Sequence, residues 1–362
     1  MSDTIIIGMS GGVDSAVAAS ILVENGYNVE AIFMKNWDDE DEEFCTAAQD
    51  YKDALQVCET LDIPLRSIDL TDEYWDKVFK IFLEECEIGR TPNPDIICNK
   101  EIKFRAFLDY SLELGAKKIA TGHYAQIKTH DNIFQLLRGK DTNKDQSYFL
   151  YRLDQYQVSK SIFPIGDLNK EYVRKKANDL GFLNHNKKDS TGICFIGERN
   201  YRNFLKKYID TQPGDIVSDK GDIIGQHEGL MYYTYGQRQG LGIGGGFGNQ
   251  EAPWYVSDKI ISENRLTVVQ GHEHPDLYHS FLTASNINWI SGSPPTNDNN
   301  ITAKIRYRSK DTPCRITKQS NNILVEFTTP KFAVAPGQSI VFYNNDICIG
   351  GGIIESRSNS KT

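Results

Sequence analysis

The feature that most constrains the fold is a glycine-rich turn near the amino terminus, Ser10-Gly11-Gly12-Val13-Asp14-Ser15. The apolar run Thr4–Met9 comes directly before it, and a helical pattern follows over Asp14–Asn25, with Gly26 as its stop. Backbone amides of such a turn, at the start of a helix, point at an anion and carry the positive end of the helix dipole. Because the two glycines lack a Cβ, phosphate oxygens can approach the backbone closely. The segment therefore predicts a strand, a phosphate-binding loop and a helix, in that order.

Strand and helix patterns keep alternating over the following residues. Further strands are expected at Asn28–Met34, Leu65–Asp69 and Lys118–Thr121. Further helices are expected over about residues 46–61, 72–88 and 100–114. Alternation of this kind implies a parallel sheet with helices on both faces. The first domain, residues 1–209, is thus predicted to be an α/β domain with a doubly wound parallel sheet.

The pattern changes from about residue 210. Glycines cluster over residues 240–246, helical periodicity disappears, and short alternating runs appear, so we expect a small β-rich middle domain over residues 210–276. A carboxy-terminal β-barrel is expected over residues 277–362, with strands at Ile301–Tyr307, Ile323–Phe327 and Ser339–Tyr343.

The net charge of −9 hides an uneven distribution. Residues 1–90 hold 6 Lys and Arg against 21 Asp and Glu, whereas the remaining residues hold 34 against 28. Phosphate binding responds to the local potential rather than to the total charge. The composition therefore leaves an RNA partner open.

The seven cysteines exclude several kinds of site. No two have C-x-x-C spacing, which argues against a zinc ribbon, a cysteine-ligated iron–sulfur cluster and a thioredoxin-type motif. No apolar stretch approaches the roughly 20 residues that span a bilayer. The first residues show no signal-peptide pattern. We therefore expect a cytoplasmic protein with no membrane partner.

The turn matches neither the Walker A pattern nor G-x-G-x-x-G. It resembles the S-G-G-x-D-S signature of the PP-loop ATP pyrophosphatases, which have an adenine nucleotide α-hydrolase-like sheet. The resemblance implies that ATP is cleaved between its α- and β-phosphates, that a carbonyl oxygen is adenylated, and that pyrophosphate leaves. Mg²⁺ is expected to accompany ATP, with Asp14 as a ligand, and no metal site made by the protein alone is expected.

Further segments resemble the tRNA-specific 2-thiouridylases within this superfamily. The most specific is Gly89-Arg90-Thr91-Pro92-Asn93-Pro94-Asp95-Ile96-Ile97-Cys98-Asn99, which matches G-R-T-P-N-P-x-x-x-C-N. The others are Ala120–Tyr124, Lys144–Tyr148, Gly192–Gly197, Gly236–Gly242 and Pro336–Ser339, so the resemblance covers essentially the whole chain. It implies ATP-dependent 2-thiolation of the wobble uridine, position 34, of tRNA, with release of AMP and pyrophosphate.

Two residues of the longest motif are candidates for the chemistry. Cys98 is expected immediately before a helix that begins near Asn99, where the helix dipole, with Lys100 and Lys103 nearby, favours the thiolate. Asp95 lies three residues earlier and would share its face in a helical turn. The resemblance assigns Cys98 as the nucleophile and Asp95 as a proton-transfer group beside the uridine.

A second thiol is implied by the resemblance alone. Cys194 lies between Ile193 and Phe195, and composition by itself describes it as a core cysteine. Because Gly192–Phe195 matches the family's sulfur-bearing segment, Cys194 is assigned as the persulfide carrier. A transient disulfide between Cys98 and Cys194 is also implied, and it requires their Cα atoms to approach within roughly 7 Å. Whether Cys98 reduces the persulfide first or closes the disulfide afterwards stays open.

The resemblance also implies the contacts to ATP and to RNA. The implied ATP contacts are Gly8, Met9, Ser10, Gly11, Gly12, Val13, Asp14, Ser15, Met34 and Gly122. The implied contacts to the target base or the tRNA are Asn93, Pro94, Asp95, His123, Lys144, Asp145, Gln146, Arg306, Tyr307 and Gln338. His123 is interpreted as an ATP or RNA contact rather than a general base, with a purely structural role as the alternative.

Two features of the expected RNA surface can be argued from the residues. Cations alternate along the expected strand Lys304–Arg308, which fits a phosphate-contacting face, and a solvated strand face is the alternative. Choosing uridine over cytidine requires hydrogen bonds at the base edge, and the turn Asn93–Asp95 is the candidate for that selection.

Partners and rival functions complete the expectations. The resemblance implies a cysteine desulfurase as sulfur donor, either directly or through a sulfur-relay protein. Another PP-loop enzyme, such as a 4-thiouridine or 2-thiocytidine synthase or an amidating ligase, is the nearest alternative. A nucleotide- or RNA-binding module without catalysis is the other, and the intact loop together with Cys98 and Cys194 argues against it.

Overall fold

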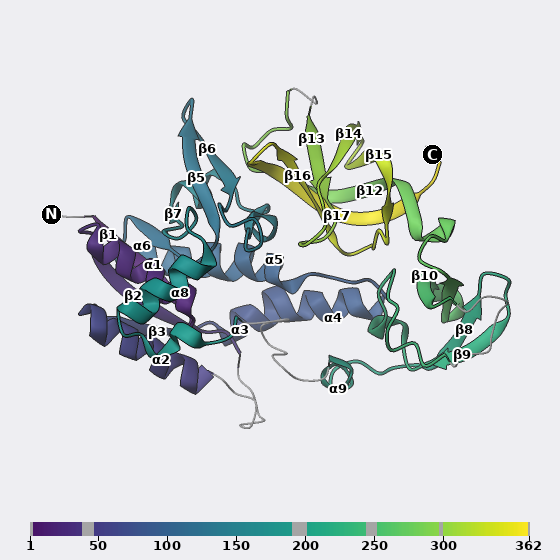
Figure 1. Cartoon of the computed structure of the whole chain (residues 1–362), viewed down its shortest axis with the longest axis horizontal. Helices are drawn as coiled ribbons and strands as arrows, with labels where there is room; N and C mark the ends of the chain where they lie inside the picture. The colour runs from purple at the N-terminus through teal and green to yellow at the C-terminus, as the bar shows by residue number, and fades with distance from the viewer. Residues whose placement is uncertain (1–2, 38–46, 190–200, 244–251, 297–299, 361–362) are drawn as a thin grey trace.

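Three sheets organise the chain in the computed structural model, which describes residues 3–37, 47–189, 201–243, 252–296 and 300–360 (Figure 1). The amino-terminal sheet is parallel throughout and has the strand order β3-β2-β1-β4-β7. Its strands are β1 (Thr4–Met9), β2 (Asn28–Lys35), β3 (Leu65–Asp69), β4 (Lys118–Ala120) and β7 (Ser161–Ile162). The central place of β1 puts the loop that follows it in the middle of one sheet edge.

Helices cover both faces of this sheet. Ile5 and Ile7 of β1 pack in one core with α1 (Val13–Glu24) and α8 (Lys170–Asp179), whereas Ile6 packs in a second core on the opposite face. This second core holds residues of α5 (Pro94–Cys98) and α6 (Phe107–Glu113). Because successive side chains of a strand point to opposite faces, the division confirms the predicted doubly wound sheet.

Two of the helical stretches contain π-helical segments. One runs through α3 (Thr71–Tyr74), η2 (Trp75–Phe79) and α4 (Lys80–Glu87); the other joins α5 to α6 through η3 (Asn99–Ala106). Other helices of this first part of the chain are α2 (Ala47–Leu61), η4 (Ser147–Leu150), α7 (Gln155–Ser159), η5 (Leu183–Asn186) and α9 (Tyr201–Leu205). Among the described residues, no helix is long and apolar enough to cross a membrane.

A four-stranded sheet is formed by the middle part of the chain. Its order is β10-β11-β8-β9, with β8 (Gly214–Ser218), β9 (Ile223–His227), β10 (Trp254–Ile260) and β11 (Arg265–Gln270). The short helices η6 (Leu230–Tyr232), η7 (Ile261–Glu263) and η8 (Pro275–Leu277) connect its strands and lead out of it. Figure 1 shows α4 reaching from the parallel-sheet domain toward β8 and β9, below the barrel.

The carboxy-terminal strands close into a six-stranded barrel, as predicted. Its order is β12-β15-β14-β13-β16-β17, and pairing of β12 with β17 closes it. The strands are β12 (Tyr278–Trp289), β13 (Ile301–Lys304), β14 (Thr312–Gln319), β15 (Asn322–Phe332), β16 (Ser339–Asn344) and β17 (Ile347–Ser358).

One expected strand of the barrel is wrong in its extent. Strand β13 ends at Lys304, so the residues up to Arg308 do not alternate along a strand face. The Ser309 hydroxyl accepts from the Arg306 amide at 3.3 Å and donates to the Arg306 carbonyl at 2.8 Å. These local bonds hold a turn that competes with the strand ladder.

A hairpin ties the first domain to the barrel. Strands β5 (Ala125–His130) and β6 (Ile133–Arg138) leave the parallel-sheet domain, and β6 pairs with β17 of the barrel. The eight-stranded sheet therefore contains strands from two of the expected domains. Domain boundaries at residues 209 and 276 stay a prediction.

Candidate active site

The glycine-rich turn joins β1 to α1, as the sequence predicts. The Ser15 hydroxyl donates to the Gly12 carbonyl at 3.0 Å and accepts from the Ser10 amide at 3.3 Å, so the turn closes on itself. Gly11 has a φ of +70°, and a Cβ there would lie 2.4 Å from the Asp50 carbonyl oxygen. Only glycine fits both the angle and the space. No side chain caps the first turn of α1, which leaves its amides able to receive an anion.

The ends of β2 and β4 meet this turn from either side. The Met34 methyl carbon lies 3.0 Å from the position of a Cβ on Gly8. Gly122 follows β4, and a Cβ there would lie 2.7 Å from the Ser15 amide nitrogen and from the Asp14 carbonyl carbon. The residues assigned to ATP by the resemblance therefore gather at the carboxyl edge of the sheet, where open parallel sheets bind ligands. Their contact with a nucleotide stays a prediction.

Charged residues that the sequence analysis missed surround Asp14. Lys170, at the start of α8, lies 2.8 Å from both carboxylate oxygens of Asp14, and Tyr124 donates its hydroxyl to the same carboxylate at 2.8 Å. Lys170 also pairs with Asp189 at 2.6 Å. Burial disfavours the charged form of Asp189, but hydrogen bonds from Lys144 and Lys170 outweigh it and lower the pKa to about 2. No local motif marked Lys170, because its partner lies 156 residues away.

The same contacts bear on the expected Mg²⁺ ligand. Both Asp14 oxygens already accept from Lys170, so Asp14 holds a cation of the chain itself in this arrangement. Among the described residues, no group of three or more His, Cys, Asp or Glu could hold a metal ion.

The helix carrying the expected nucleophile begins earlier than predicted. Asn93 caps it by accepting from the Asp95 amide at 3.1 Å, and Pro94 is its first residue. Cys98 therefore lies in the second turn of a helix that continues to Glu113, and the expected position before the helix start is wrong. Helical proline at the first position explains the difference, because its fixed φ favours a start there. Cys98 therefore does not lie at a helix start, where the dipole would favour its thiolate.

Cys98 and Asp95 lie one helical turn apart, as expected. Cys98 is only 4% exposed and packs in a core with Phe79, Phe82 and Ile102. Burial raises the pKa of Asp95, and the charge of Lys103 opposes the rise only in part. A carboxyl group that protonates more readily than usual suits proton transfer.

The predicted approach of Cys98 to Cys194 lies outside the described residues, because Cys194 does. Helix α9 begins seven residues after Cys194, and its Phe204 and Leu205 pack in the same core as Cys98. Met34 packs against that core as well, so one cluster connects the carboxyl edge of the parallel sheet to Cys98.

His123 is buried and held in place. Its Nδ1 lies 2.8 Å from the Thr121 hydroxyl, and its ring lies 5.7 Å from that of Phe104 and 5.9 Å from that of Phe163. Burial, followed by the charge of Lys103, lowers the pKa of His123 well below 6.5. The imidazole is therefore neutral near pH 7, and its contact with ATP or RNA stays a prediction, with a purely structural role as the alternative.

The expected RNA-contacting residues lie in different settings. Lys144 is half-buried and pairs with Asp189, and Gln146 accepts from the Tyr124 amide at 3.0 Å. Asp145 is 4% exposed and accepts from the amides of Gly139 and Ser147, both at 3.1 Å. Direct contact of Asp145 with RNA does not fit this burial, so we assign it the role of shaping the Lys144–Gln146 segment.

The three barrel residues assigned to tRNA are already engaged with protein. Arg306 donates to the carbonyls of Tyr235 and Ala333, at 2.8 and 2.9 Å. The Tyr307 ring lies 4.5 Å from that of Phe149. Gln338 donates to the Thr91 carbonyl at 2.6 Å.

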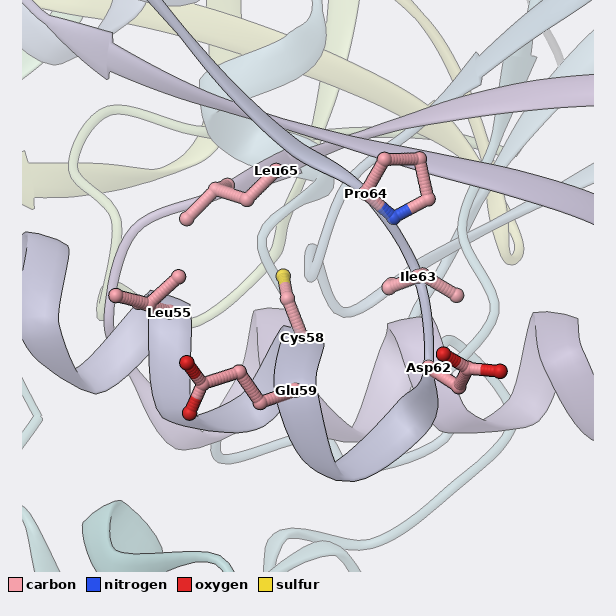
Figure 2. A pocket seen from close by; sticks show the side chains of 7 residues that line it. All are labelled: Leu55, Cys58, Glu59, Asp62, Ile63, Pro64 and Leu65. Atoms are coloured by element: carbon pink, nitrogen blue, oxygen red, sulfur yellow. The ribbon is translucent and has the colours of Figure 1, made fainter.

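Two pockets occur outside the edge that carries the glycine-rich turn. The one in Figure 2, of about 380 Å³, lies between α2 and the start of β3, at the opposite sheet edge, and is lined by Leu55, Cys58, Glu59, Asp62, Ile63, Pro64 and Leu65. Burial, then the charge of Glu59, raises the pKa of Cys58 to about 11, which disfavours its thiolate form. The other pocket, of about 330 Å³, is basic and is lined by Ile305, Arg306, Arg308, Ser309, Lys331 and Phe332.

Family models match three consecutive parts of the chain. Residues 3–198 match the tRNA methyl transferase HUP domain, residues 202–270 the tRNA methyl transferase PRC-barrel domain, and residues 279–354 the aminomethyltransferase beta-barrel domain. These matches cover the regions of the three sheets.

Curated relatives match over the full length. A tRNA-specific 2-thiouridylase MnmA of Hydrogenovibrio crunogenus is 54% identical over 98% of this chain and 95% of its own. One of Shigella dysenteriae is 55% identical over 99% of both chains. Two of the family models are those of tRNA methyl transferase domains, whereas the full-length relatives are 2-thiouridylases. The relatives carry more weight, because the identity to them extends over the whole chain.

Similarity to solved structures is weaker. The U34-tRNA thiolase NcsA of Methanococcus maripaludis, solved with its [4Fe-4S] cluster, is 18% identical, with a TM-score of 0.36 over 57% of this chain and 63% of its own. A similarity of this size says nothing about the chemistry of this chain.

Proposed function

Because this chain belongs to the family of tRNA-specific 2-thiouridylases, which are tRNA sulfurtransferases, we propose that it uses ATP to replace O2 of the wobble uridine with sulfur. The observation that carries the proposal is the meeting of the β1 turn, Met34 and Gly122 at one sheet edge, beside the core that holds Cys98. This arrangement suits activation and sulfur transfer at neighbouring places.

The first step in this proposal is activation of the base. Amides of Gly11, Gly12 and the first turn of α1 bind the phosphates of ATP, and the C2 carbonyl oxygen of the uridine attacks the α-phosphate. The base oxygen gains AMP and pyrophosphate leaves. Lys170 attracts the departing pyrophosphate, since it is a buried cation beside the loop. Mg²⁺ would neutralise phosphate charge there.

The second step is sulfur transfer. The terminal sulfur of a Cys194 persulfide attacks C2 and AMP leaves with the oxygen. The Cys98 thiolate then attacks the Cys194 sulfur, which releases 2-thiouridine and leaves a Cys98–Cys194 disulfide. In the alternative order, Cys98 first reduces the persulfide, and the hydrogen sulfide that is released attacks C2. Asp95 moves a proton in either order, which its raised pKa favours.

The RNA lies across the first domain and the barrel in this proposal. Asn93, Pro94 and Asp95 contact the target base, and His123 contacts the RNA or ATP in its neutral form. Lys144, Gln146, Arg306, Tyr307 and Gln338 position the tRNA. Gln338 would have to exchange its bond to Thr91 for one to RNA. A cysteine desulfurase, or a relay protein loaded by one, supplies the persulfide sulfur.

The test uses the full chain with ATP, Mg²⁺, unmodified tRNA and a persulfide donor. Digestion and mass spectrometry should find 2-thiouridine, and pyrophosphate should appear with it. Cys194→Ala should form no thionucleoside and still bind ATP. Sulfur at C4 or on cytidine would contradict the proposal, and so would pyrophosphate release without thiolation, which would indicate a ligase.

A further inference from the structure

The loop Gly89–Asn93, which leads into α5, is where three parts of the molecule meet. From the middle domain, Lys259 donates to the Gly89 carbonyl at 2.8 Å, and the Ile261 side chain lies 2.3 Å from the position of a Cβ on Gly89. Lys259 is 6% exposed, so this contact is closed to solvent. The middle domain thus fixes the beginning of the loop.

The barrel holds the centre of the same loop. The Thr91 amide donates to the Pro336 carbonyl at 3.2 Å, and Gln338 donates to the Thr91 carbonyl. Gly337, with a φ of +91°, lies so close that a Cβ would come within 2.8 Å of the Thr91 nitrogen. Both backbone groups of Thr91 are therefore bound by the barrel.

Arg90 makes a charged link between the first domain and the barrel. Its Nε lies 2.8 Å from a carboxylate oxygen of Glu85, on α4 of its own domain. Its Nη1 lies 2.8 Å from Glu355, on β17 of the barrel, and its Nη2 donates to the Ile354 carbonyl at 3.1 Å. Burial disfavours the charged form of Glu355, but hydrogen bonds from Arg90 and Ser285 outweigh it and lower the pKa of that carboxyl. The planar guanidinium donates from Nη1 and Nη2 to two barrel acceptors while its Nε side faces Glu85, a spread of nitrogens that the single ammonium nitrogen of a lysine lacks.

We propose that Arg90 is a positioning residue for sulfur transfer: by joining α4 to β17 it fixes the entry of α5 and therefore the places of Asp95 and Cys98. The role rests on the proposed function of those two residues. Pro92 and Pro94 have fixed φ angles, so a shift of Arg90 passes into α5 with little relaxation. Misplacement of reacting groups by about 1 Å can cost roughly 100-fold in rate.

The experiment compares two arginines that each fasten the barrel. Arg90→Met removes the link to the loop. Arg357→Met is the matched control: Arg357 lies two residues after Glu355 and joins β17 to Asp258 of the middle domain at 3.1 Å, and its other hydrogen bonds go to the Ser257 and Val334 carbonyls. Each variant is measured in single turnover with persulfide-loaded enzyme, for tRNA affinity, and for the rate of Cys98 alkylation without substrates.

We expect a loss of thiolation rate that is specific to the Arg90 variant. Arg90→Met should slow single-turnover thiolation by roughly tenfold or more and change Cys98 alkylation, with tRNA affinity within about twofold. Arg90→Lys should recover part of the rate, and Arg357→Met should stay near the wild type. Glu355→Gln added to Arg90→Met should cost little more, because the two side chains act as one link.

Two outcomes would overturn the role. One is an equal loss in Arg90→Met and Arg357→Met that follows the loss of thermal stability, since it would indicate fastening of the barrel alone. The other is unchanged thiolation and unchanged Cys98 alkylation in Arg90→Met. A wild-type enzyme that makes no 2-thiouridine would contradict the proposed function instead, and the alkylation rates would still test whether Arg90 positions Cys98.

Discussion

At the residue scale, the charge next to the glycine-rich turn depends on Lys170. This lysine is 8% exposed and lies between Asp14 and Asp189, which also pairs with Lys144 and Arg174. The network holds its cation at a fixed place before any phosphate arrives. Such a preorganised charge acts strongly where water is excluded.

Lys170→Met tests this assignment, because it removes the cation and keeps most of the apolar stem. The KM for ATP should rise by about tenfold or more, since two half-buried carboxylates lose a partner and the phosphates lose a cation. The measurement is pyrophosphate release at varied ATP, and the KM for tRNA should hardly change. Lys176→Met on the same helix is the control, because Lys176 pairs with the exposed Glu24. Equal KM values for ATP in the two variants would contradict the role of Lys170 in the proposed mechanism.

At the element scale, the turn after β1 depends on its contact with the end of β4. Gly122 lies against the backbone of Asp14 and Ser15, so two neighbouring strand ends define the shape of the loop together. Neither strand alone would fix the directions of the loop amides.

Gly122→Ala should therefore weaken ATP binding. The added methyl group would lie 2.7 Å from backbone atoms, which cannot move aside as a side chain can. Overpacking of this kind costs about 1–3 kcal/mol, which corresponds to roughly fivefold to 150-fold in affinity where the binding loop carries the strain. Isothermal titration with ATP checks it. Gly225→Ala in β9 is the control, because its nearest neighbour would lie at 3.6 Å. Normal ATP affinity in Gly122→Ala would contradict the binding of ATP at this turn.

At the scale of the whole molecule, the first domain and the barrel share a core. Leu136, Tyr148 and Tyr151 of the first domain pack in one cluster with Val341 and Cys348 of the barrel. The hydroxyl of Tyr148 donates to the Ser339 carbonyl at 2.8 Å, and that of Tyr151 lies 3.1 Å from the Ser339 hydroxyl. A shared core of this kind couples the unfolding of the two parts.

Tyr148→Phe should lower the free energy of unfolding by about 1–3 kcal/mol, because it leaves a buried carbonyl without its donor. Urea unfolding measures the change. Tyr156→Phe, at a side chain that is 53% exposed, should be nearly neutral. Calorimetry of the wild type should show the first domain and barrel unfolding together. Two separate transitions, with Tyr148→Phe as stable as the wild type, would contradict a shared core.

The sequence by itself determined the features that depend on short stretches of chain. Apolar runs and helical periodicity predicted β1, β3 and the parallel sheet, because alternation of these patterns permits few folds. Spacing within motifs predicted the glycine-rich turn and the one-turn separation of Asp95 and Cys98. These are local relations, so a reader of the sequence can reach them.

Only the tertiary structure decided the features that join distant residues. The start of α5 at Pro94 placed Cys98 inside a helix and a buried core, which removed the helix-start argument for its reactivity. Pairing of Lys170 with Asp14, of β6 with β17 and of Arg90 with Glu355 spans more than 150 residues in each case. No periodicity or spacing encodes such contacts, because they arise when separate domains pack around one loop. The turn at Ser10–Ser15 could thus be predicted from the sequence alone. The charged residues beside it, and the core that connects it to Cys98, could be found only from the fold.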